Sequence, residues 1–190
     1  MTIAPAKTTA ITLEEFLALP ETKPASEYIN GQIYQKPMPQ GKHSTLQSEL
    51  ITLINSLAKP RRIAYAFPEL RCVFGGRAVV PDIAVLEWHR IPLDGNGEPE
   101  NRIAIPPDWL IEILSPEQST LFLIEKLDFC IRHGSKLGWL VAPEERGILA
   151  FSTNKFSYHQ GQDILPVLEV LRDWQITATD IFNLLKFAQG

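Results

Sequence analysis

The sequence predicts an α/β (α+β) protein in which helices cover a central β-sheet. Two short apolar runs, residues 79–86 and 109–114, each carry one acidic residue. Runs in which both alternating faces are apolar are typical of central strands in a covered sheet. Two longer stretches, residues 43–59 and 119–133, have the length of helices, and the first repeats its apolar residues at intervals of three and four. Together these patterns predict a sheet buried beneath helices.

The chain begins with a segment that has no core pattern. We expect residues 1–10 to form a flexible tail and residues 11–190 to form one domain, because 190 residues with 45% hydrophobic content suffice for one ample core. A short helix is predicted over residues 12–17. Thr12 would be its N-cap, and Glu15 would complete a capping box.

A hairpin and the first long helix come next. Residues 27–29 and 32–34 are predicted to pair as strands, because Asn30-Gly31 supplies the two positive-φ residues of a type I′ turn. After a loop rich in proline and glycine, the apolar residues of segment 43–59 fall on one helical face. Pro60 ends this helix.

The middle of the chain predicts strands and one long loop. Residues 63–67 and 69–74 are expected to be strands, and Gly75-Gly76 turns the chain into the strand that carries Asp82. Residues 89–107 separate the two acid-bearing strands. This segment is rich in proline, glycine, asparagine and charge, which predicts a surface loop.

The C-terminal third returns to helices and strands. The second long helix, residues 119–133, is ended by Gly134. Three further strands are predicted, over residues 137–141, 147–152 and 156–159. Residues 177–187 are expected to form a closing helix.

Composition indicates where such a protein would work. Cys72 and Cys130 form neither a paired metal motif nor a disulfide framework, which suits a reducing cytoplasm. We expect no signal peptide and no membrane span, because no apolar run approaches the ~20 residues that a span needs. The net charge of -4 counts mildly against a strong nucleic-acid binder but leaves room for a local basic groove.

The two acids are the most informative residues in the chain. Asp82 shares its strand face with apolar neighbours, and Glu112 shares its face with Leu110 and Leu114. A buried carboxylate costs several kcal/mol unless a cation or a hydrogen-bond donor compensates it. Two acids on neighbouring strands could therefore share one divalent cation.

One basic residue points away from the solvent side of the second long helix. Glu125, Asp128 and Arg132 share a polar stripe, whereas Lys126 projects roughly 120° away from it. Lys126 could serve an anionic site, or its chain could run along the edge of the core toward solvent. The helical spacing by itself does not decide between these two interpretations.

Several other residues are weaker candidates. His43 and Gln47 lie one turn apart near the apolar side of the first long helix, and Glu69 precedes a strand next to that of Asp82. The main concentration of basic residues could follow a phosphate backbone or could be ordinary surface charge. It comprises Lys59, Arg61, Arg62, Arg71 and Arg77.

Four segments follow one another in a specific order. They are Val80-Pro81-Asp82, the strand 111–116 (IEILSP), a helix with a lysine, and residues 138–143 (GWLVAP). In these segments the chain resembles the bacterial Uma family of endonucleases, which belongs to the restriction-endonuclease-like PD-(D/E)xK superfamily. The resemblance implies a restriction-endonuclease-like fold, a central mixed β-sheet flanked by helices.

The resemblance also implies a site and its chemistry. Asp82 and Glu112 would bind Mg²⁺ or Mn²⁺, with the backbone carbonyl of Ile113 as a third ligand, and the substrate would be DNA. Mg²⁺ commonly takes one or two carboxylates, water and substrate phosphate. Lys126 would orient the attacking water, and Glu27 would be an accessory acid. Two subunits would act as a homodimer.

The chain departs from the superfamily pattern in two places. Leu114 stands where the motif expects lysine, so the resemblance assigns that role to Lys126. Residues 121–124 (LFLI) replace the polar helix start found in many relatives. Two functions therefore remain: a metal-dependent DNA endonuclease, or an inactive nuclease-like domain that binds nucleic acid or a protein.

Overall fold

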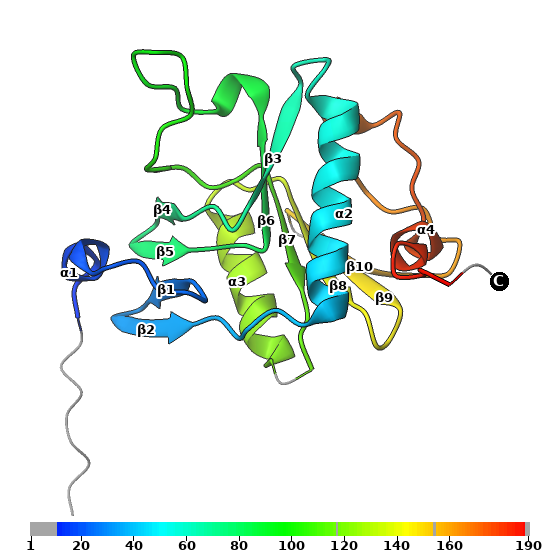
Figure 1. Cartoon of the computed structure of the whole chain (residues 1–190), viewed down its shortest axis with the longest axis horizontal. Coiled ribbons are helices and arrows are strands. Elements are labelled where there is room, and N and C mark those ends of the chain that lie inside the picture. Colours follow the sequence, from blue (N-terminus) through cyan, green and yellow to red (C-terminus); the bar gives the residue numbers. More distant parts are fainter. Residues whose placement is uncertain (1–10, 117, 154, 189–190) are drawn as a thin grey trace, which may run out of the picture.

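The computed structural model describes residues 11–116, 118–153 and 155–188, and within these ranges it has ten strands in two sheets (Figure 1). The predicted tail, residues 1–10, lies outside the described residues, so the predicted division into tail and domain stays a prediction. No helix in these ranges is both long and apolar enough to cross a membrane.

The larger sheet has six strands in the order β10-β9-β8-β7-β6-β3. Its strands are β3 (Ala64–Pro68), β6 (Ile83–Glu87), β7 (Trp109–Ile113), β8 (Leu137–Ala142), β9 (Gly147–Ser152) and β10 (Lys155–Gln160). β7 and β8 pair in parallel, and the other neighbours pair antiparallel. A parallel pair needs a crossover, which α3 (Thr120–Arg132) supplies. The predicted central mixed sheet is confirmed.

The smaller sheet has four strands in the order β2-β1-β5-β4. They are β1 (Ser26–Ile29), β2 (Gln32–Gln35), β4 (Cys72–Phe74) and β5 (Arg77–Val79). Asn30 and Gly31 have φ values of 51° and 84°, as the predicted type I′ turn requires. The preceding helix α1 (Leu13–Ala18) has the predicted capping box and packs Phe16 on Tyr28.

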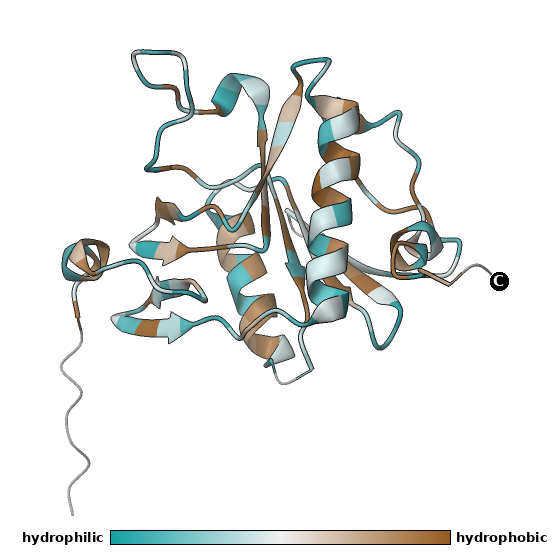
Figure 2. Ribbon diagram, in the orientation of Figure 1, coloured by the Kyte–Doolittle hydropathy of each residue, from teal (hydrophilic) through white to brown (hydrophobic). Residues whose placement is uncertain are grey.

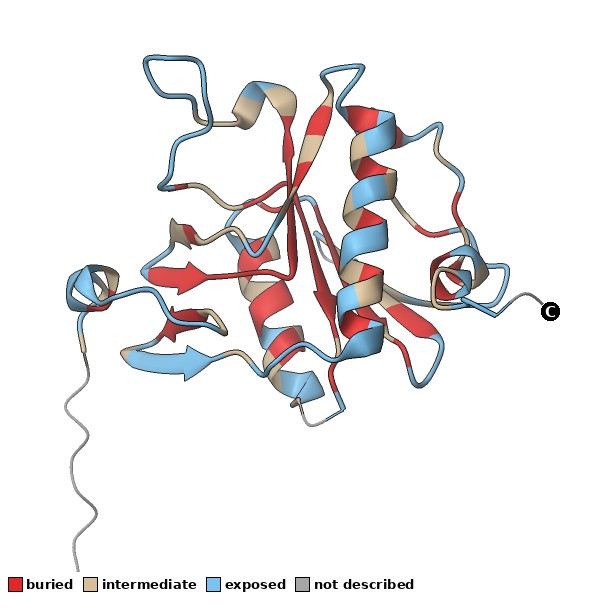
Figure 3. Ribbon diagram, in the orientation of Figure 1, coloured by how far each residue is buried: buried red, intermediate tan, exposed pale blue. Residues whose placement is uncertain are grey.

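Helices cover both faces of the larger sheet, and β6 and β7 run between α2 (Gly41–Ala58) and α3 (Figure 1). On one face, α2 and α4 (Ala178–Asn183) pack on the cluster that contains Trp109 and Trp139. On the other face, α3 packs on a second apolar cluster. Apolar positions line the inner sides of these helices (Figure 2), and β6 and β7 are buried along their whole length (Figure 3). This burial explains why both strands read as continuous apolar runs.

Gly138 of β8 sets how closely α3 approaches the sheet. A Cβ atom at this position would lie 2.7 Å from Cδ2 of Leu127, which is on α3. Because glycine has no side chain, the backbone of α3 can lie close to the sheet. The close approach matters for function because α3 also carries Lys126.

Four predicted elements need correction. The run 79–86 is not one strand: β5 ends at Val79, β6 begins at Ile83, and the chain passes from one sheet to the other between them. The strand predicted over 69–74 is only β4, because Glu69 has a φ of 44°. Loop 89–107 is not wholly on the surface, since Ile103 is buried and its carbonyl accepts from the N–H of Val73 at 2.8 Å. The closing helix ends at Asn183 rather than at residue 187.

Two short 3₁₀ helices were not predicted. They are η1 (Trp88–Arg90) and η2 (Glu169–Leu171). Each is a single tight turn of three residues. Three residues are too few for a hydrophobic period to be recognised in the sequence.

Candidate active site

Asp82 lies at the corner where the chain leaves the small sheet and enters β6. Its side chain is 3% exposed. Oδ2 accepts from the backbone N–H of Ile113 at 2.7 Å and lies 3.1 Å from Nε2 of His43, while Oδ1 contacts the ammonium of Lys36. Both oxygens of this carboxylate thus contact a donor or a cation.

The residues around Asp82 come from two separate elements. His43 and Gln47 lie on the first two turns of α2, and the side-chain amide of Gln47 donates to the carbonyl of Asp82 at 2.8 Å. Lys36 directly follows β2, where its own N–H still pairs with the carbonyl of Ala25. The predicted pair His43 and Gln47 therefore contacts Asp82, through the carboxylate and the backbone respectively.

Glu112 forms a second cluster on β7. It is fully buried, and its Oε1 lies 2.7 Å from the ammonium of Lys126. The same ammonium lies 2.5 Å from Oε1 of Glu27 and donates to the carbonyl of Val80 at 3.3 Å. Glu27 also accepts from the N–H of Val80 at 2.6 Å. Lys126 thus points into the protein and bridges two acids, so its chain does not run out to solvent.

Burial and neighbouring charges shift the pKa values of these groups in different directions. Burial raises the pKa of Glu112 to about 7, because desolvation and the nearby charge of Asp82 outweigh the attraction of Lys126. Burial also acts to raise the pKa of Asp82, but Lys36 and His43 outweigh it and hold that pKa below its usual range. Desolvation opposes the charge on Lys126, yet Glu112 and Glu27 raise its pKa.

Acids outnumber lysines in this cluster. Three buried carboxylates, those of Glu27, Asp82 and Glu112, face the ammonium groups of Lys36 and Lys126. Oε2 of Glu112 and Nδ1 of His43 also lack a hydrogen-bond partner within the described residues. A buried carboxylate oxygen without a donor fits a cation.

The number of side-chain ligands limits which cation fits. Within the described ranges, no three histidine, cysteine, aspartate or glutamate side chains are placed to hold a metal together. Mg²⁺ and Mn²⁺ need no such set, because they bind through one or two carboxylates, backbone oxygen and water.

Two hollows of about 300 Å³ each flank the acids. Glu27, Tyr34, Lys36, Ser119 and Phe122 line the first. His43, Leu114, Ser115, Pro143 and Glu144 line the second. Glu27 and Lys36 thus border one hollow, and His43 borders the other.

The apolar start of α3 has a packing role. The rings of Phe122 and Tyr34 lie 5.1 Å apart, so this end of α3 docks on the β1–β2 hairpin. Leu123 is buried in the core, and Leu121 is exposed. Two residues of the unusual LFLI segment are therefore explained by contacts, whereas nothing in the structure explains Leu121.

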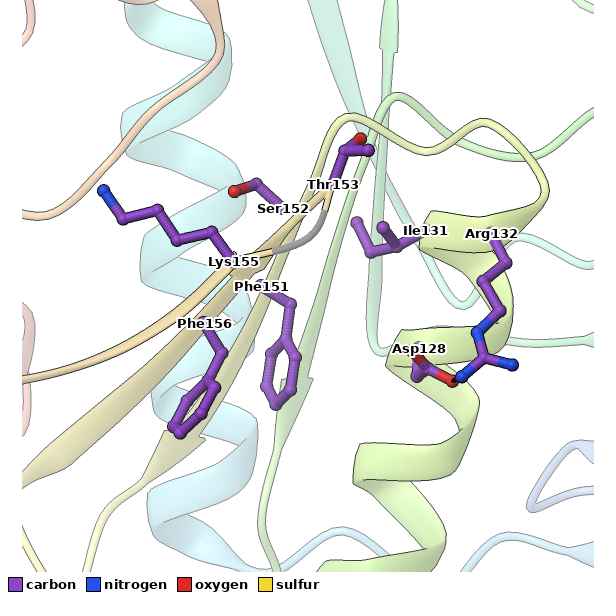
Figure 4. A pocket seen from close by; sticks show the side chains of 8 residues that line it. All are labelled: Asp128, Ile131, Arg132, Phe151, Ser152, Thr153, Lys155 and Phe156. Carbon is purple, nitrogen blue, oxygen red and sulfur yellow. Dashed lines mark ion pairs between the residues drawn. The ribbon is translucent and has the colours of Figure 1, made fainter.

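A larger hollow of about 540 Å³ lies between α3 and the β9–β10 hairpin (Figure 4). Its walls include Phe151, Phe156 and an ion pair of Asp128 with Arg132 at 2.8 Å. None of the buried acids lines it. Its size alone does not make it the site of chemistry, because the convergent charged groups lie elsewhere.

The remaining candidates lie outside the charged cluster. The side chain of Glu69 is exposed, and this residue reaches the site only through its N–H, which donates to the carbonyl of Asp82 at 3.2 Å. Arg71 pairs with Glu21, and Arg77 pairs with Glu125 at 2.8 Å. Arg61 and Arg62 are exposed just beyond α2. The five basic residues therefore do not form one patch.

Lys36 is the site residue that sequence analysis missed, although a signal existed. The Asn30-Gly31 turn fixes the hairpin register, which places Glu27 opposite Tyr34. Lys36 follows Tyr34 by two residues and so lies on the same face. Extending the hairpin register by one pair would have placed Lys36 opposite Ala25, on the same face as Glu27 and diagonal to it.

A mixed sheet between helices, with acids at adjacent strands and a lysine from the next helix, defines a nuclease-like protein with a restriction-endonuclease-like fold. Family comparison agrees: residues 13–179 match the Uma2 model, described as "Putative restriction endonuclease", and the chain belongs to this family. The chain is also similar to a crystal structure described as "a putative nuclease belonging to DUF820", from Anabaena variabilis ATCC 29413. The identity is 48% over 93% of this chain and 99% of the other, with a TM-score of 0.91. No curated protein matches significantly.

Proposed function

We propose that this protein is a metal-dependent endonuclease that hydrolyses phosphodiester bonds in DNA. The family supports a nuclease-like function, and one observation carries the finer proposal: three buried acids face only two buried lysines. A divalent cation would fit such a site, in which Oε2 of Glu112 has no donor within the described residues. Mg²⁺ is the proposed cofactor, and Mn²⁺ is the proposed substitute.

Asp82 and Glu112 would hold the cation together with the carbonyl of Ile113. The N–H of Ile113 donates to Asp82. Because the N–H and C=O of one strand residue point to the same side, we expect this carbonyl to face Asp82 too. When bound, the cation would polarise the scissile phosphate and acidify an attacking water.

The protein side chains would orient these groups. Lys126 keeps Glu112 in place through its ion pair, and its charge would assist the attacking water. Glu27 holds Lys126 from the opposite side. His43 fixes one oxygen of Asp82 and thereby the direction of the other. The untested predictions of DNA as substrate, a homodimer and a cytoplasmic location belong to this proposal.

Plasmid cleavage tests the proposed function. Wild-type protein with Mn²⁺ should nick supercoiled plasmid, and Asp82→Asn and Glu112→Gln should each lower the rate by roughly 100-fold or more, because each removes a charge that stabilises the transition state. Glu169→Gln is the matched control, since Glu169 is exposed and pairs only with Arg172. Equal nicking by wild-type, Asp82→Asn and Glu112→Gln proteins would contradict the proposal.

A second function is favoured by Leu114, which occupies the motif position of the lysine. An inactive domain that binds nucleic acid or a protein would need no lysine there. The same preparations discriminate the two functions if plasmid binding is measured beside cleavage. DNA binding by wild-type and Asp82→Asn proteins, with cleavage by neither, would favour the binding module.

A further inference from the structure

The ammonium of Lys36 lies where a cation on Asp82 would lie. It contacts Oδ1 of Asp82 and donates to the carbonyl of Val80 at 3.0 Å. The side chain is only 7% exposed although Lys36 comes from the segment after β2, outside the sheet that carries both acids. A lysine brought in from another element thus neutralises the first acid of the site.

The other oxygen of Asp82 has no room for a cation. Oδ2 is held by Nε2 of His43 at 3.1 Å and by the N–H of Ile113 at 2.7 Å. Since both of these donors contact Oδ2, a cation shared with Glu112 would have to bind Oδ1. Lys36 occupies that oxygen.

From this we infer that Lys36 is an internal counter-ion that closes the cation-free site and must leave Asp82 when a divalent cation binds. The inference rests on the proposed function. A divalent cation on Oδ1 of Asp82 would meet the ammonium of Lys36 at the same oxygen, and departure of Lys36 removes the repulsion between these two cations.

The structure also offers a place for the displaced side chain. Lys36 lines the hollow of about 300 Å³ that it shares with Glu27, Tyr34 and Phe122. Its stem has four rotatable carbons, so the ammonium can swing into this hollow while the backbone stays paired with Ala25. There its charge would face a phosphate of the substrate. Lys36 would thus move from the carboxylate of Asp82 to a substrate phosphate when the cation and the substrate bind.

Cation affinity tests this exchange without measuring cleavage. Lys36→Gln removes the competing charge, so the variant should bind Mn²⁺ on the order of 10-fold more tightly than wild type in a calorimetric titration. Lys155→Gln is the matched control: Lys155 is an exposed lysine on β10 that lines neither hollow beside the acids, and its loss should leave affinity unchanged. Lys36→Arg keeps the charge and should bind Mn²⁺ no more tightly than wild type.

Thermal unfolding provides a second readout, because Lys36→Gln leaves Asp82 without one partner and lowers stability. Mn²⁺ should raise the midpoint of the variant more than that of wild type, and folding only when Mn²⁺ is present would also support the inference. If Lys36→Gln binds Mn²⁺ clearly but no more tightly than wild type, the inference about Lys36 is wrong and the proposed metal site stands. The inference is also wrong if Lys36→Gln fails to fold even when Mn²⁺ is present. No Mn²⁺ binding by either protein would overturn the proposed metal site as well.

Discussion

Asp82 and Glu112 are both buried, but their carboxylates have opposite surroundings. Asp82 is met by two cationic or polar side chains and a backbone N–H, so its ionised form is stabilised. Glu112 has one lysine, which it shares with Glu27. Two acids with pKa values pushed apart in this way are a feature of functional sites.

The pKa of Glu112 predicts how stability depends on pH. Because folding raises this pKa from 4.5 to about 7, the folded protein holds a proton that the unfolded chain has lost between these values. Stability from this group is complete below pH 4.5 and falls by on the order of 3 kcal/mol as the pH rises to 7. Asp82 has the opposite sign: its stabilisation is present above its ordinary pKa of 3.8 and is lost as the pH falls below that value.

Urea denaturation at pH 5 and pH 7.5, with a chelator present, measures this loss. Glu112→Gln cannot titrate, so its free energy of unfolding should change less between the two pH values than that of wild type. Glu145→Gln, at an exposed position, should behave like wild type. A parallel pH dependence of wild type and Glu112→Gln would contradict the assigned pKa.

At the scale of elements, the site depends on how α2 joins the edge of the larger sheet. β3 is an edge strand, and its buried Ala66 has both backbone groups capped by Asn55 of α2, at 2.8 and 3.0 Å. These two hydrogen bonds satisfy backbone groups on the free edge of β3. They also anchor α2, which carries His43 and Gln47 at its other end.

Asn55→Ala should destabilise the protein by roughly 2 to 4 kcal/mol, because it leaves a buried N–H and a buried C=O without partners. Chemical denaturation measures the change. Ser56→Ala, one residue further along the exposed side of the same helix, should change stability by less than about 0.5 kcal/mol. Equal stability of the two variants would mean that the cap contributes nothing.

At the scale of the whole molecule, two of the five residues in the predicted basic group are occupied by ion pairs. Arg71 and Arg77 pair with acids and also lie over the rings of Phe16 and Phe129. Lys59, Arg61 and Arg62 form no ion pair within the described residues, and Lys59 lies 5.5 Å from the ring centroid of Tyr65. Any phosphate contact by this group of residues is therefore expected beyond the end of α2.

The double substitution Arg61→Gln and Arg62→Gln should weaken DNA binding and make it less dependent on salt. Each lost phosphate contact lowers the slope of log affinity against log salt by about 1. Fluorescence anisotropy with a labelled duplex at several salt concentrations measures this slope. Arg172→Gln, an exposed arginine that pairs with Glu169, is the control, and equal slopes would place the DNA elsewhere.

Much of the fold could be predicted because its signals are local. The capping box at Thr12, the Asn30-Gly31 turn and the apolar period of α2 depend on neighbours within a few residues. The errors arose where distant segments decided the structure. The corner at Asp82 lies between two sheets, and Ile103 is buried because it pairs with β4.

Alternation and helical spacing by themselves determined that two acids stand in apolar segments and that Lys126 lies outside the polar stripe of its helix. Local periodicity reports which face a side chain occupies, but not what it meets there. Only the tertiary structure decided the partners: Lys126 bridges Glu112 to Glu27, and Lys36 neutralises Asp82. The reason is physical. A buried charge must be compensated through space, and here the compensating lysines come from a hairpin and a helix far away in the sequence.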